Sequence, residues 1–225
     1  MTIRIGMLFF EGYEMLDAFG PLEMFALRNT LVPNSYEIVY ISGSDYADDN
    51  MLTVQSSGGP KIAANYNLIT CPSLDLLCIP GGQGTRNQVN NKPLLDWIKM
   101  KGLESGSIMT ICTGSALLAK TGLLDGLKAT SNKYALKSFV IPQGPKVNWQ
   151  PTARWVYDVH IETGTKIWTS SGISAGTDLS LAMISQHFGH DSAKDVADRA
   201  EYVWNEDPDN DPFSYQVNMA DLDTK

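Results

Sequence analysis

The segment Ser107–Gly126, SIMTICTGSALLAKTGLLDG, places a cysteine where a strand-like run meets a helix-like run. Residues 108–112 suit a buried strand and the sequence from Gly114 suits a helix, so Cys112 lies at the join. A nucleophile at such a turn, followed two residues later by glycine, matches the nucleophile elbow, although Thr110 replaces the usual first glycine. The N–H groups of a helix start carry partial positive charge, so we expect a lowered pKa and a thiolate at Cys112. The alternative is that Cys112 is a small buried hydrophobe.

Two other segments end in residues that could serve the same site. The strand-like run LDLLCIPGG ends in Gly81 and Gly82, whose N–H groups, with that of Thr113, could stabilise a developing negative charge. The other reading of these glycines is a plain tight turn. Asp17 precedes Pro21, which suits a first helical turn, so Asp17 is expected at or just before a helix start. One reading of Asp17 at this place is a helix cap. The other is a carboxyl held beside the Cys112 sulfur, where the negative charge of the thiolate raises the pKa of Asp17 and lets it donate a proton.

The elements that must position these residues alternate between strand and helix patterns. Strands are predicted at 3–10, 36–42, 74–82 and 108–112, and helices at 15–29, 92–104, 114–122 and 175–189, with short strands between 146 and 172. This alternation predicts an α/β sandwich of the flavodoxin-like or Rossmann-like kind, a mostly parallel sheet with helices on both faces. Ligands in such sheets bind at the carboxyl ends of the strands. We expect one domain over 1–225, with an extended tail at about 205–225 on the surface.

Composition narrows the class of protein. A net charge of −8 without a basic stripe argues against nucleic-acid binding, and no apolar run reaches the length of a membrane helix. The N-terminus lacks the order of a signal peptide, and three cysteines form no disulfide framework, so we expect a cytoplasmic protein. Cys78, in an apolar strand, is predicted to be core, and Cys71, before a proline, to be a loop or edge residue.

Four motifs in order, DAFGPLEMF, LCIPGGQGT, ICTGSALLAKTGLLDGLKAT and SSGISAGTDLSLAM, resemble the ThiJ/PfpI superfamily of class I glutamine amidotransferase-like proteins. The resemblance spans about 3–202 and is strongest to the isonitrile hydratase-like branch. It implies Cys112 as nucleophile, Asp17 as its acidic partner, and Gly81, Gly82, Thr113 and Gly172 as oxyanion or substrate-binding positions. Glu23 matches a second acid of the motif and is expected to be structural. Related regulators carry a helix-turn-helix module, which we do not expect here before Lys225.

The chain departs from several relatives in its histidines. Thr113 stands where protease-like relatives place a histidine after the cysteine, and Asn132 stands in a region where others carry one. His160 lies in an alternating strand, and His187 and His190 are expected to close a helix, so we predict no Cys–His dyad. Asp207, Asp209 and Asp211 alternate like a calcium loop, but Pro212 holds the required glycine position, so we assign no metal and no other cofactor.

We therefore predict a cysteine-dependent, isonitrile hydratase-like enzyme acting on a small molecule through a Cys112 thioimidate. One alternative is a cofactor-free glyoxalase or deglycase acting on methylglyoxal, which needs a base such as a histidine near the sulfur. Another is a redox-sensing stress protein in which Cys112 oxidises to sulfinic acid. Relatives are commonly homodimers, and we expect one here.

Overall fold

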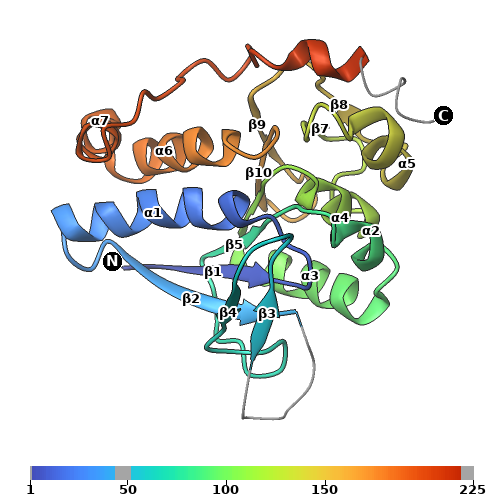
Figure 1. Cartoon of the computed structure of the whole chain (residues 1–225), viewed down its shortest axis with the longest axis horizontal. Coiled ribbons are helices and arrows are strands. Elements are labelled where there is room, and N and C mark those ends of the chain that lie inside the picture. The colour runs from blue at the N-terminus through green and yellow to red at the C-terminus, as the bar shows by residue number, and fades with distance from the viewer. Residues whose placement is uncertain (1, 44–51, 219–225) are drawn as a thin grey trace.

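In the computed structural model, which describes residues 2–43 and 52–218, one six-stranded sheet runs through the molecule (Figure 1). Its order is β2 (Tyr36–Ser42), β1 (Ile3–Phe9), β5 (Leu76–Ile79), β6 (Ser107–Thr110), β10 (Lys166–Ser170) and β9 (Trp155–Val159). Neighbouring strands are parallel except for β9, which pairs antiparallel with β10 at the edge. The prediction of a mostly parallel sheet is confirmed. The expected tail beyond residue 218 lies outside the described residues.

Helices cover both faces of this sheet, as the alternating pattern predicted. On one face α1 (Met15–Leu31) packs beside α6 (Ala175–Phe188), and α7 (His190–Arg199) contacts both (Figure 1). On the other face α3 (Lys92–Ser105) and α4 (Gly114–Lys120) contact each other and strand β6, with short α2 (Thr85–Gln88) and α5 (Ile141–Gln143) beside α4. This arrangement brings the carboxyl ends of β1, β5 and β6 to one edge.

The sequence prediction did not include two single helical turns or the short strands β3 (Thr53–Gln55), β4 (Lys61–Ala63) and β7 (Lys128–Ala129), whereas β8 (Asn148–Trp149) falls in the region where short strands were predicted. β3 pairs antiparallel with β4, and β7 pairs parallel with β8. A π-helical turn covers Leu136–Val140, and a 3-10 turn covers Ser214–Asn218. Each has five residues or fewer, which is too short for a hydrophobic period to stand out.

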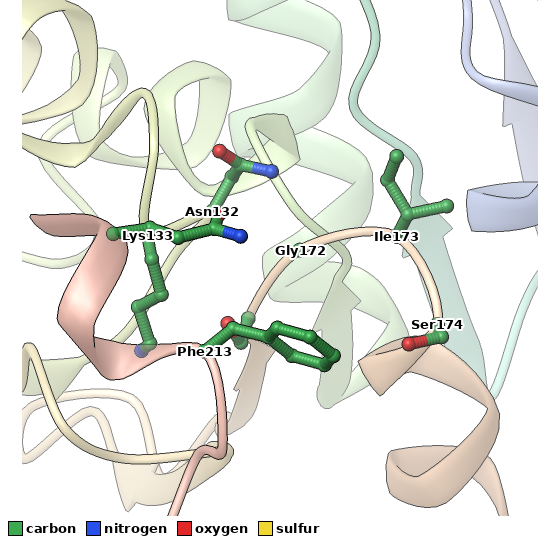
Figure 2. A pocket seen from close by; sticks show the side chains of 8 residues that line it. Asn132, Lys133, Gly172, Ile173, Ser174 and Phe213 are labelled. Carbon is green, nitrogen blue, oxygen red and sulfur yellow. The ribbon is translucent and has the colours of Figure 1, made fainter. Parts of the chain in front are cut away.

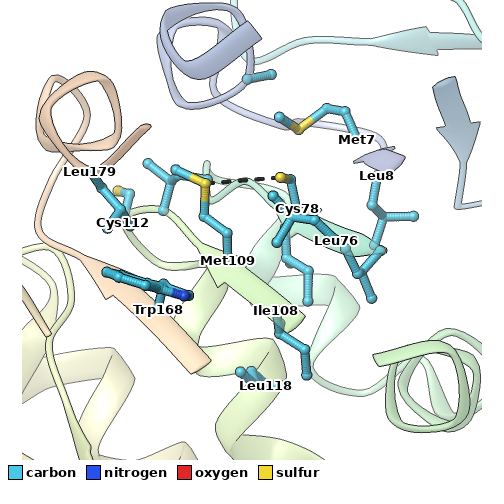
Figure 3. Close-up of a cluster of buried hydrophobic side chains, with 14 of the residues drawn as sticks. Met7, Leu8, Leu76, Cys78, Ile108, Met109, Cys112, Leu118, Trp168 and Leu179 are labelled. Atoms are coloured by element: carbon cyan, nitrogen blue, oxygen red, sulfur yellow. Dashed lines mark hydrogen bonds between the residues drawn. The ribbon is translucent and has the colours of Figure 1, made fainter. Parts of the chain in front are cut away.

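The core around the central strands contains two of the three cysteines, Cys78 and Cys112 (Figure 3). Cys78 on β5 is fully buried, and its sulfur lies 3.9 Å from the sulfur of Met109 on β6 (Figure 3). Its assignment to the core is therefore confirmed. Cys71 is half-buried in the loop before β5, as expected. No helix within the described ranges is long and apolar enough to cross a membrane.

Three local expectations were wrong. Helix α1 begins at Met15, so Pro21 lies inside the helix and Asp17 in its first turn. Pro21 has no N–H to donate to the carbonyl of Asp17 one turn earlier, so α1 lacks one backbone hydrogen bond there. The helix continues through Pro21, which is buried. Gly189, at a φ of 90°, ends α6, and His190 opens α7 instead of closing the preceding helix.

The described part of the C-terminal segment runs over the surface, as predicted (Figure 1). Eight of its residues between 206 and 215 are exposed. The prediction did not include its two buried residues, Val217 and Asp211, the latter only 1% exposed. Asp211 turns inward toward Lys133 and Arg154, which anchors the segment.

Candidate active site

Cys112 lies on a tight corner between β6 and α4. Strand β6 ends at Thr110 and α4 begins at Gly114, and between them Cys112 has a φ of 55°, a conformation that residues with a side chain rarely adopt. The Cys112 N–H donates to the carbonyl oxygen of Ser171, 3.0 Å away. A Cβ atom at Gly114 would collide with the carbonyl oxygen of Ile79, which explains the glycine. The predicted strand–turn–helix corner is therefore present, with its strain at the cysteine.

Asp17 is buried beside this corner and has one unused oxygen. Its Oδ2 accepts a hydrogen bond from the Gly81 N–H at 2.8 Å, whereas Oδ1 has no hydrogen-bond partner within the described residues. Burial raises the pKa of Asp17 well above its usual value, the Glu14 carboxylate raises it further, and the Gly81 N–H and the Cys112 thiol lower it. Burial outweighs the rest. The net effect of these neighbours favours the protonated form of Asp17 next to the sulfur.

The expectation of a lowered pKa at Cys112 was wrong. The side chain is only 5% exposed, and burial, followed by the Asp17 charge, raises the pKa of the thiol above its ordinary value. Hydrogen bonds to the sulfur from the N–H groups of Ile173 and Thr113 and from the Asn132 side chain act in the opposite direction. Two like charges cannot both form in this space, so the Asp17–Cys112 pair retains at least one proton.

The glycine turn after β5 supports the acid instead of facing the reacting atom. The Gly81 N–H is taken by Asp17, and the Gly82 N–H donates to the Thr113 hydroxyl at 3.1 Å. A Cβ at Gly81 would lie 2.5 Å from the Thr113 nitrogen and 2.8 Å from Asp17 Oδ2. The predicted pair of free donors at Gly81 and Gly82 is therefore not found. The turn instead holds the carboxyl and the Thr113 hydroxyl in place.

A cavity of about 320 Å³ opens at Cys112. That volume is at the low end of sites that bind small molecules. Its lining residues come from six separate segments of the chain: Glu14, Gly82, Gln83, Arg86, Cys112, Thr113, Asn132, Tyr134, Ala135, Ile173 and Gln216. Cys112, Gly82 and Thr113 were predicted to meet, and they do.

Eight of the eleven wall residues were missed by sequence reasoning as members of the site, among them Arg86, Ile173, Asn132 and Gln216. Arg86 lies over the Phe139 ring at 4.3 Å and brings a cation to the cavity. Ile173, at a φ of 25°, directs its N–H to the sulfur. Asn132 contacts the sulfur. It lies in the region where some relatives carry a histidine, and that position in the motif could have indicated it as a site residue. Nothing in the sequence indicated Gln216.

Gly172 does not line the cavity at Cys112. It lies on a second, adjoining cavity, where a Cβ atom would come within 2.5 Å of the Asn132 amide nitrogen (Figure 2). Its absent side chain allows Asn132 to pack closely against this loop. Gly172 was predicted as an oxyanion or substrate-binding position, and the structure places it on the adjoining cavity and not on the one at Cys112.

The remaining predicted residues lie away from the sulfur. All three histidines fall within the described residues and none lines the cavity: His160 contacts Thr163, His187 contacts Tyr36, and His190 pairs with Glu206. Glu23 is exposed on α1. The three aspartates of the calcium-like run do not share a face, because Asp211 is buried whereas Asp207 and Asp209 are exposed.

Comparisons of the sequence and of the structure with known proteins indicate the same family. The sequence profile of the DJ-1/PfpI family matches residues 3–186. The isonitrile hydratase of Pseudomonas putida is 29% identical over 203 residues, covering 90% of this chain and 80% of that protein. Protein DJ-1 homolog A of Arabidopsis thaliana is 26% identical over 181 residues, covering 79% of this chain and 42% of that protein. A crystal structure of a ThiJ/PfpI family protein from Pseudomonas syringae has a TM-score of 0.76 at 26% identity, covering 99% of this chain and 86% of that one.

Proposed function

The chain belongs to the DJ-1/PfpI family, and we propose that it is an enzyme that hydrates isonitriles, converting R–N≡C and water into an N-substituted formamide. The observation that carries this proposal is the buried Asp17 carboxyl, with an unpartnered Oδ1 and a raised pKa, beside the Cys112 sulfur. An isonitrile carbon accepts both a proton and a nucleophile, so one acid and one thiol suffice. The similarity to an isonitrile hydratase over 90% of the chain supports the same reaction.

The first step joins the sulfur to the isonitrile carbon. Asp17 gives its proton to that carbon while the Cys112 sulfur forms a bond to it and the thiol proton passes to the carboxyl. The product is a thioimidate, S–CH=N–R, and Asp17 is again protonated. Because the thiol proton is transferred during the attack, the raised pKa of Cys112 is compatible with this step.

The second step releases the formamide. Asp17 protonates the thioimidate nitrogen, and the resulting carboxylate removes a proton from the water that adds to the carbon. The tetrahedral adduct S–CH(OH)–NHR then expels the sulfur, which regains a proton from the hydroxyl through Asp17. The formamide HC(=O)–NHR leaves, and both residues return to their starting protonation states.

Two features of the site disfavour the alternatives. A histidine-assisted glyoxalase reaction needs an imidazole base to move a proton between carbons, and none of the three histidines lines the cavity. Redox sensing needs an accessible thiolate, whereas Cys112 is 5% exposed and its pKa is raised by burial.

An activity panel tests the proposal. Purified wild type and Cys112→Ser are assayed with cyclohexyl isonitrile and with methylglyoxal. We expect formamide production by the wild type, a loss of at least ~10³-fold in Cys112→Ser, and no turnover of methylglyoxal. Turnover of methylglyoxal alone supports the glyoxalase reading. Turnover of neither, with selective oxidation of Cys112 by mild peroxide, supports the sensor.

A further inference from the structure

A second cavity of about 210 Å³ adjoins the one at Cys112. We call it the side chamber; its lining residues are Asn132, Lys133, Ser171, Gly172, Ile173, Ser174, Phe213 and Gln216. Asn132, Ile173 and Gln216 also line the cavity at Cys112, so the two spaces meet at these side chains. A molecule whose reacting atom is at the sulfur can therefore extend into the side chamber.

One wall of the side chamber comes from the C-terminal segment. Figure 2 shows the Phe213 ring of this segment lying close to the backbone at Gly172, with Asn132 across from it. Phe213 and Gln216 lie beyond residues 3–186, the part of the chain that matches the family profile. The family resemblance therefore assigns no role to this wall.

Buried charges hold the C-terminal segment in place. The Asp211 carboxylate lies 3.7 Å from Lys133 Nζ and 3.6 Å from Arg154 Nη1, and all three side chains are at most 5% exposed. The Asp211 N–H donates to the Thr152 carbonyl oxygen at 2.8 Å. The Phe213 N–H donates to Asp211 Oδ1 at 2.9 Å, which connects this anchor directly to the ring in the wall.

The lining of the side chamber favours an uncharged group. Of the described residues around it, Lys133 alone is charged, and its Nζ donates to the Thr130 hydroxyl and the Ala153 carbonyl and faces Asp211. The Phe213 ring and the Ile173 side chain supply apolar surface. Burial of an apolar ring against these side chains is favourable. Burial of a carboxylate would be unfavourable, because it would lose its hydration and find no unpaired cation in the chamber.

We propose that the side chamber binds the substituent R of the isonitrile, that it prefers an uncharged ring, and that Phe213 determines this preference. The proposal rests on the proposed function, because it assigns a place to the part of the substrate remote from the reacting carbon. Phe213 is 45% exposed, so its truncation is expected to leave the fold intact.

The test compares a large and a small substrate in matched variants. kcat/KM is measured with cyclohexyl and methyl isonitrile for wild type, Phe213→Ala and Tyr215→Ala, the last on the same segment, 57% exposed and outside both linings. We expect Phe213→Ala to lower kcat/KM for the cyclohexyl substrate by about 10-fold or more and to leave the methyl substrate within about 2-fold. Tyr215→Ala should change neither. Equal losses on both substrates, or no loss, overturn the proposal.

A binding measurement separates failure of the side chamber from failure of the reaction. If the wild type hydrates no isonitrile, the proposed function fails, and binding of N-cyclohexylformamide is measured by ligand-observed NMR. Binding to wild type and Cys112→Ala with loss in Phe213→Ala supports the side chamber as a binding site for this group. No binding to the wild type, or equal binding to Phe213→Ala, overturns it.

Discussion

Asp17 and Asp178 are buried acids in the first turns of two helices that pack side by side, yet their surroundings are opposite. Asp178 Oδ2 accepts hydrogen bonds from Arg154 Nε and Nη2 at 2.9 and 2.7 Å, and its Oδ1 accepts from the Tyr202 hydroxyl and the Asn205 N–H, each at 3.0 Å. Asp17 has one N–H on Oδ2 and, among the described residues, nothing on Oδ1.

This difference supports the proposal that Asp17 is the reactive acid and that Asp178 is structural. Asp178 has a cation and four donated hydrogen bonds, so its charge is compensated and it ties Arg154 and the C-terminal segment to α6. Asp17 has no such compensation, so burial favours its neutral form and leaves a proton available for transfer. Burial is common to both acids, and the hydrogen bonds to their oxygens are what distinguish them.

The largest expected effect follows from replacing Asp17. Asp17→Asn keeps the shape but removes the transferable proton, so kcat for isonitrile hydration should fall by about 10² to 10⁴-fold. The folded protein should be at least as stable as the wild type at pH 7, because an uncompensated buried acid is removed. Steady-state kinetics and chemical denaturation check both expectations. A kcat near that of the wild type would remove Asp17 from the mechanism.

Replacing Asp178 should reverse that pattern. Asp178→Asn leaves the Arg154 guanidinium buried beside a neutral amide, and we expect the free energy of unfolding to fall by about 3 kcal/mol. kcat with methyl isonitrile, measured per folded molecule, should stay within about 3-fold of the wild type, because Asp178 touches neither cavity. A large loss of kcat without loss of stability would mean that Asp178 also acts in catalysis, and the two acids would then not differ in role.

The pH dependence of stability sharpens the comparison further. The folded-state pKa of Asp17 is raised above its usual value of 3.8, so the folded protein binds a proton that the unfolded chain releases. The stabilisation from this group is fully present below pH 3.8 and is lost as the pH rises toward the folded-state pKa. The stability advantage of Asp17→Asn over the wild type should therefore be absent at low pH and grow above pH 3.8. Urea denaturation at several pH values measures it, and a pH-independent difference would contradict the raised pKa.

The smallest effect is expected at the second buried cysteine. Cys78 also has a raised pKa from burial, but its sulfur contacts Met109 and lies in the hydrocarbon core (Figure 3). Cys78→Ala should leave kcat unchanged and lower the free energy of unfolding by about 1 kcal/mol through the small cavity created. Loss of activity at this position would mean that Cys112 is not the sole reacting thiol.

The sequence predicted the parts of this site that depend on local pattern. The strand and helix periods around Cys112, the close approach at Gly114 and the location of Asp17 at the N-terminal end of a helical run are all encoded within short windows. The mostly parallel sheet with helices on both faces also followed from the alternation of strands and helices. These features depend on neighbours in sequence, which a single chain displays.

The rest depends on contacts between distant loops. Ile173 reaches the sulfur through a strained backbone that no residue type indicates, and Asn132 does so because Gly172 leaves it space. The acidic C-terminal run suggested solvent exposure, yet Asp211 pairs with two buried cations more than fifty residues earlier in the chain. The pKa of Cys112 was predicted in the wrong direction because helix polarity is visible in sequence and burial is not.

Infrared difference spectroscopy of wild type minus Asp17→Asn at pH 7 tests the central claim most directly, namely that Asp17 holds a proton beside Cys112. The account predicts a carbonyl stretching band of a protonated carboxylic acid that is present in the wild type and absent from the variant. A carboxylate band in its place would show that Asp17 is ionised at rest, and the proton-transfer scheme would be contradicted.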